Sequence, residues 1–197
     1  RLDLLPMAFT KQSAMCVRID TGAGFLVLDP SSQSRADEVV NALIEALPGL
    51  ALALLHTQTS PAAAMAQWLS TQEAPLGFSI DRECELKSES EEKSVVRYGR
   101  HPLDIEEIQA HIAAGKLPTK LALSWDERVS FVLTEGLQIK KLAFLDAATQ
   151  GQSDGGGFDA DVALATGELR QFIPELIEVL GGESDRTLHS SQDGAPL

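Results

Sequence analysis

Apolar and polar residues alternate near the start of the chain in the pattern of a β-hairpin. Residues 15–19 alternate between the two sides of a strand, and residues 25–28 form a second apolar run. The Gly-containing segment 20–24 separates the two runs. Two short apolar runs around such a turn predict an antiparallel hairpin.

Helical spacing follows the hairpin. Apolar residues from Ala36 to Leu47 recur every three or four positions, which predicts an amphipathic helix closed by Pro48-Gly49. Residues 50–55 form a short apolar run that favours a buried strand. Ser60 before Pro61 is typical of a helix start. The helix that follows is expected to bury Met65, Trp68 and Leu69.

The second half of the chain predicts mainly strands, with one helix inside and one at the end. Strands are expected at 77–86, 94–98, 120–125, 129–134 and 138–145, and residues 152–157 as a loop. Asp104 with Glu107 predicts the N-cap of a helix that ends at Gly115. Apolar spacing from Leu169 to Leu180 predicts a final helix, in which Pro174 should cause a kink or a restart.

This order of elements predicts an α+β fold, with antiparallel sheets and helices packed on one face. The first half is of ββαβα type, and the second combines a β-meander with a C-terminal helix. We expect one α+β unit over 1–76, a second over 77–183 and a disordered tail over 184–197.

Composition indicates a soluble globular chain with an uneven charge. Hydrophobic residues make up 44% and charged residues 23%, and the net charge is −13. Nine of the sixteen Lys and Arg residues fall between Lys87 and Lys141, whereas the segment after residue 145 is strongly acidic. Acidity of this size repels nucleic acid at long range, but a local basic stripe can still bind phosphates.

The same composition indicates a cytoplasmic location. No apolar run approaches the length of a membrane span, and no signal-peptide pattern is present, so no membrane partner is expected. Cys16 and Cys84 are predicted to be buried free thiols of a reducing compartment. The chain begins at Arg1, which suggests a piece of a longer protein.

Asp20-Thr21-Gly22-Ala23 matches the active-site tetrapeptide of aspartic proteases. Such an enzyme needs two carboxylates that share a proton, so a single copy would have to dimerise. The alternative is a hairpin turn, in which Asp, Thr and Gly are all common. The position between two predicted strands favours the turn, and we expect a protein that binds and does not catalyse.

Other sites of chemistry are not indicated. The four histidines have no metal-ligand spacing, and the Gly-rich segments lack the residues of a dinucleotide or phosphate loop. We therefore expect no metal, no cofactor and no catalytic residues.

The remaining signals concern binding. Basic residues cluster around the predicted hairpin of the second half and on the meander, where they could contact phosphates without reading sequence. A solvated surface is the alternative, because Glu83, Glu85 and three further glutamates lie among them. Phe9 is either a core residue or a contact for a protein partner, so an interaction module without DNA stays open. The basic residues are Lys87, Lys93, Arg97, Arg100, Lys116, Lys120, Lys140 and Lys141.

Several short stretches, in order along nearly the whole chain, resemble the bacterial recombination-associated RdgC family. They are Leu4-Leu5-Pro6 with Ala8-Phe9, Ile19-Asp20-Thr21, Gly77-Phe78, Glu85-Leu86-Lys87, Ala114-Gly115-Lys116, Thr119-Lys120-Leu121-Ala122-Leu123 with Trp125, Phe158-Asp159-Ala160-Asp161, Thr166-Gly167-Glu168-Leu169, Leu176-Ile177-Glu178 and Leu180-Gly181-Gly182-Glu183.

The resemblance implies a nucleoid-associated ring homodimer that encircles single- and double-stranded DNA with little sequence preference. It implies restraint of RecA-driven recombination by competition for DNA, and no enzymatic activity. It places Phe9 at a dimer contact and Arg97, Arg100 and His101 on a hairpin beside the hole. Lys116 and Lys120 are expected to add DNA contacts. The resemblance also implies an N-terminal region with a lysine-rich helix, expected ahead of the residues of this chain.

Overall fold

The structure is a computed structural model that describes residues 14–30, 32–88, 94–149 and 157–184. The chain divides into two units, with the boundary between Leu54 and Leu55. We had expected the boundary after residue 76. It lies earlier because Met65 and Leu69, on the helix that was assigned to the first unit, are fully buried in the core of the second.

The first unit contains the expected hairpin and helix. Strands β1 (Cys16–Asp20) and β2 (Phe25–Asp29) pair antiparallel, and helix α1 covers Gln33–Ala46. Ala36 is the buried residue of α1, whereas Ile44 and Leu47 are exposed. The predicted apolar face of this helix is therefore only partly covered.

Two predictions for the first half are wrong. Residues 50–55 form no strand: they pair with none of the described strands, and Leu54 is 79% exposed, so the run is not buried as its composition predicted. The first half is thus ββαα and not ββαβα. Cys16 is exposed, whereas Cys84 is buried as expected, and its burial raises the pKa of the thiol to about 12.

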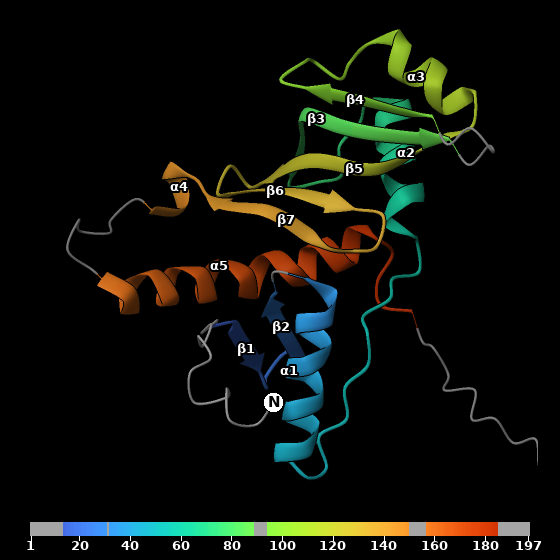
Figure 1. The fold of residues 1–197 in the computed structure, drawn as a ribbon. Helices are drawn as coiled ribbons and strands as arrows, with labels where there is room; N and C mark the ends of the chain where they lie inside the picture. The colour runs from blue at the N-terminus through green and yellow to red at the C-terminus, as the bar shows by residue number, and fades with distance from the viewer. Residues whose placement is uncertain (1–13, 31, 89–93, 150–156, 185–197) are drawn as a thin grey trace, which may run out of the picture. The chain divides into compact units, whose positions relative to one another are not determined.

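The second unit is built on one antiparallel sheet with the strand order β4-β3-β5-β6-β7 (Figure 1). The predicted hairpin and meander are both confirmed. In the meander, β5 pairs with β6 and β6 with β7, so consecutive strands are neighbours. The strands are β3 (Phe78–Ser88), β4 (Val95–Gly99), β5 (Lys116–Trp125), β6 (Val129–Thr134) and β7 (Ile139–Phe144).

Helices cover one face of this sheet and enclose a single core, which confirms the α+β class. Met65, Ile108 and Phe172, one from each of three helices, are buried in the same cluster as the inward residues of the strands. Phe131 and Phe172 pack edge to face, with ring centroids 4.7 Å apart. The helices are α2 (Pro61–Thr71), α3 (Glu106–Ala113), the short α4 (Asp146–Thr149) and α5 (Gly157–Val179).

Helix starts agree with the sequence in one case and differ in another. Ser60 Oγ accepts a hydrogen bond from the Ala63 N–H, and Pro61 occupies the first turn of α2, as predicted. Helix α3 starts after Ile105, and its cap has no side-chain hydrogen bond, so the predicted Asp104 cap is wrong. Pro174 lies inside α5 without ending it.

Two polar contacts hold α5 against the sheet. The Trp125 Nε1–H donates to Glu175 Oε2 at 2.7 Å. Arg128, at the β5–β6 turn, donates from Nε to Glu168 Oε2 at 2.9 Å and from Nη1 to the Ala147 carbonyl at 3.2 Å. Glu168 is buried, and the guanidinium supplies the partner that a buried carboxylate requires. Among the described residues, no helix is long and apolar enough to cross a membrane.

Candidate functional site

The face of the five-stranded sheet opposite the helices carries most of the second unit's strand charges; we call it the outer face. Cys84 is paired with Tyr98 and Leu121 on the core side. Because side chains alternate along a strand, Glu85 lies on the outer face with its partners Arg97 and Lys120. The outer face includes Asp81, Glu83, Glu85, Lys87, Arg97, Lys120, Ala122, Ser124, Ser130, Val132, Lys140, Lys141 and Ala143.

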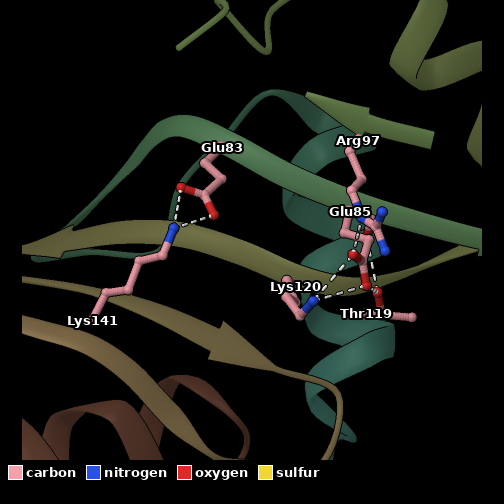
Figure 2. Close-up of polar contacts among 6 residues, drawn as sticks. All are labelled: Glu83, Glu85, Arg97, Thr119, Lys120 and Lys141. Atoms are coloured by element: carbon pink, nitrogen blue, oxygen red, sulfur yellow. Dashed lines mark hydrogen bonds and ion pairs between the residues drawn. The ribbon is translucent and has the colours of Figure 1, made fainter. Parts of the chain in front are cut away.

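Glu85 is the centre of a polar cluster that joins three strands (Figure 2). Its Oε2 accepts from Arg97 Nε of β4 at 2.6 Å. From β5, Lys120 Nζ lies 3.1 Å from each carboxylate oxygen, and Thr119 Oγ1 donates to Oε1 at 2.7 Å. One carboxylate therefore holds two cations side by side on the sheet.

The carboxylate lies below the two cations. The Glu85 side chain is 14% exposed, whereas Arg97 is 72% and Lys120 is 38% exposed. Figure 2 shows the cluster on the side of the sheet away from α2. The arrangement presents positive charge to solvent and keeps the negative charge underneath. The exposed cations are able to bind an anion from outside.

The environment of Glu85 keeps it ionised. The hydrogen bond from Arg97 and that from Thr119, followed by Lys120, lower the pKa of Glu85 from 4.5 to about 2, against an opposing effect of burial. The cluster is therefore fully charged at neutral pH.

This pKa predicts how stability depends on pH. A depressed carboxyl pKa stabilises the folded chain above the unfolded value of 4.5, and the contribution is lost as the pH falls towards about 2. Glu85→Gln should lower the free energy of unfolding at pH 7 by about 1–2 kcal/mol, because it removes the ionised partner of Arg97 and Lys120. The loss is limited to this size because Arg97 is exposed and water screens its interaction with Glu85. Urea unfolding at pH 7, 4.5 and 3 should show this difference shrink with acid; a constant difference would contradict it.

A second carboxylate of β3 holds the far edge of the sheet. Lys141 Nζ of β7 lies 2.6 Å and 2.8 Å from the two oxygens of Glu83 (Figure 2). Between these strands, the outer-face row is occupied by Ala122 of β5 and Val132 of β6, which pair with each other. Both are small enough to let the lysine stem pass over them, and both are buried.

The other predicted site residues lie at the two ends of the strands. Arg100 and His101 follow β4, are exposed, and are joined to β3 by the His101 N–H, which donates to the Arg82 carbonyl at 3.2 Å. Lys116 lies at the other end of the strands, where it pairs with Ser88. Its Nζ lies 3.1 Å from His111 Nδ1. The structure thus brings Arg97 and Lys120 together and places the other three at the ends of the same strands.

Comparison with known proteins identifies the family of this chain. The family model described as "Putative exonuclease, RdgC" matches residues 1–183. The chain belongs to the RdgC family. It is 51% identical over 189 residues to a recombination-associated protein RdgC of Dechloromonas aromatica, and 49% identical over 186 residues to that of Herminiimonas arsenicoxydans. These alignments cover 92% of this chain and 62% of each relative, so the chain spans less than two thirds of their length.

The Asp-Thr-Gly segment of this RdgC-family chain forms the hairpin turn. Asp20 Oδ1 accepts the N–H groups of Gly22 at 3.1 Å and Ala23 at 3.0 Å, and its Oδ2 lies 2.9 Å from Arg18 Nη2. The turn interpretation is confirmed, because the carboxylate caps the backbone that reverses the chain. No group of three His, Cys, Asp or Glu side chains is placed to hold a metal within residues 14–30, 32–88, 94–149 and 157–184.

Sequence reasoning missed the part played by the acidic residues of β3. From the sequence, Glu83 and Glu85 only reduced the net positive charge of the region. In the structure, Glu83 pairs with Lys141, and Glu85 pairs with Arg97 and Lys120. Their spacing of two residues in a predicted strand was the available signal, since it puts both on one face. Phe9, the proposed dimer contact, and Lys93 lie outside the described residues, as do residues 185–197 of the predicted tail.

Proposed function

We propose that this chain binds DNA through the outer face of its five-stranded sheet and the adjoining ends of the strands. The observation that carries the proposal is the local charge. The chain as a whole has a net charge of −13, yet the described outer face has five cations and three carboxylates. Arg97 and Lys141 are more than 60% exposed, within reach of an external phosphate.

Phosphates are the expected targets on the DNA. The cations stand on strands, widely spread across a sheet, and contact phosphates whatever the base sequence. Arg97 uses its Nε for Glu85, and its Nη groups carry further donors of the type that binds phosphate oxygens. Binding of both single- and double-stranded DNA with little sequence preference follows from this chemistry.

The family supports a proposal for the wider role. Its relatives are named recombination-associated proteins, and recombination is a process of DNA strands. We propose that the protein acts in the nucleoid of the cytoplasm as a ring-shaped homodimer with a contact at Phe9. Occupation of DNA by the dimer would restrain RecA-driven strand exchange. In this role the protein works by binding, without an enzymatic reaction of its own.

Salt dependence of DNA affinity tests the proposal. Anisotropy of fluorescein-labelled single- and double-stranded DNA, each in two unrelated sequences, should give dissociation constants that agree within about threefold between sequences. The logarithm of affinity should fall linearly with the logarithm of salt concentration, by about 0.7–0.9 per phosphate neutralised. The protein should also leave the DNA uncut. The length of the DNA on a gel should be the same before and after incubation with the protein, with and without magnesium.

Two outcomes would contradict DNA binding at this surface. One is the lack of any anisotropy change at about 50 mM salt, where phosphate contacts are strongest. The other is affinity that is indifferent to salt. Capture of a defined protein partner in the absence of any DNA binding would instead favour the interaction module considered from the sequence.

A further inference from the structure

We propose that Glu85 and Glu83 limit the affinity for DNA by competing with phosphates for the cations of the outer face. The inference rests on the proposed function and deepens it, because it assigns a role to acidic residues in a surface that binds an acidic polymer. The carboxylates of β3 already bind these cations within the folded chain. An incoming phosphate must displace the carboxylates or share the cations with them.

The competition follows from the geometry of the contacts. Three of the five outer-face cations are held by carboxylates of β3: Arg97 and Lys120 by Glu85, and Lys141 by Glu83. The distances, 2.6–3.1 Å, are those of charge-assisted hydrogen bonds. Carboxylate and phosphate oxygens use the same donors, so a cation held by one is less available to the other.

Glu85 is the better anchored side of this competition. Thr119, which is 7% exposed, donates to Glu85 Oε1 at 2.7 Å and keeps the carboxylate in place below the surface. Arg97 and Lys120 have long flexible stems and more exposed ends. When a phosphate approaches, the cations are able to move towards it while the carboxylate stays. DNA contacts of this kind are made and broken easily, as suits a protein that covers DNA of any sequence.

If Glu85 had only a structural role, its neutralisation would have a different result. A residue that only positions Arg97 and Lys120 for DNA would weaken binding when it is neutralised, because the cations lose their orientation. A competitor strengthens binding when it is neutralised, because the cations are released. The direction of the change in affinity separates the two roles.

The test compares three Glu→Gln variants of the full chain for binding to fluorescein-labelled double-stranded DNA. Glu85→Gln should bind about three- to tenfold more tightly than wild type at about 100 mM salt, since one charge is removed beside two cations. Its salt dependence should steepen by about one further phosphate contact. Glu83→Gln, in an exposed pair, should tighten binding less. Glu178 is exposed on α5, the helix that packs against the other face of the sheet. Glu178→Gln makes the same change in net charge and should have the smallest effect.

The outcomes distinguish this inference from the proposed function. If wild type fails to bind DNA at low salt, the proposed function fails and the inference falls with it. If wild type binds with the expected salt dependence while Glu85→Gln and Glu83→Gln match Glu178→Gln or bind more weakly, only the competition is overturned. Glu83→Gln keeps the test decisive if Glu85→Gln unfolds, because the Glu83 side chain is 41% exposed, against 14% for Glu85.

Discussion

Replacing Arg97, Lys120 and Lys141 together with glutamine should weaken DNA binding about ten- to a hundredfold at about 100 mM salt. Three cations are lost from the outer face, and Glu83 and Glu85 are left without their cationic partners, so the surface becomes net negative. The slope of the logarithm of affinity against that of salt should fall by about two to three. Anisotropy titrations with DNA of two unrelated sequences measure both quantities.

Arg170→Gln is the matched control for this prediction. Arg170 is exposed on α5, which packs against the opposite face of the sheet. It should be compared with the single variant Arg97→Gln, since each removes one exposed positive charge. Arg97→Gln should weaken binding to both DNA sequences equally, and Arg170→Gln should have little effect. Equal losses in the two variants would mean that the outer face has no special part in binding.

The second large effect concerns the core. Phe172→Ala should lower the free energy of unfolding of the second unit by about 3–5 kcal/mol. Phe172 is fully buried and contacts the rings of Phe78, Trp125 and Phe131, so truncation leaves a cavity between α5 and the sheet. Chemical denaturation followed by tryptophan fluorescence measures the loss, because Trp125 lies at the same contact.

Phe158→Ala on the same helix is the matched control. Phe158 is 76% exposed near the start of α5, so the same truncation removes little buried surface. It should change the free energy of unfolding by less than about 0.5 kcal/mol. If the two variants lose similar stability, α5 does not pack against the sheet through Phe172.

Local patterns were sufficient for the sheet of the second unit. The alternation in residues 129–134 and the turn residues before and after it predicted the meander, because each strand pairs with its neighbour in sequence. Such pairs need only a strand pattern and a short turn.

Features that depend on distant partners were not predictable from local patterns. The apolar run at 50–55 has the composition of a buried strand but pairs with none of the described strands. Helix α5 starts at Gly157, well before the apolar spacing at Leu169, because its first turns are exposed and need no apolar face. The partnership of Glu168 with Arg128 joins residues far apart in sequence.

The candidate site shows the same division. The sequence predicted Arg97 and Lys120 as exposed cations, and both lie at the surface. Their meeting at Glu85 depends on the register of β3 against both β4 and β5, which includes irregular pairing. Sequence spacing does not determine that register. The role of the acidic residues therefore emerged only with the structure.

Photo-crosslinking to DNA tests most directly whether the outer face is the surface that binds. A photoreactive amino acid replaces Ala143, exposed on β7 opposite Ser130, or Glu178, exposed on α5. The Ala143 change leaves every charge of the face in place. Irradiation of the DNA complex should crosslink DNA from position 143 and not from position 178, and added salt should abolish the crosslink. Crosslinking from position 178 alone, or equally from both, would contradict DNA binding by the outer face.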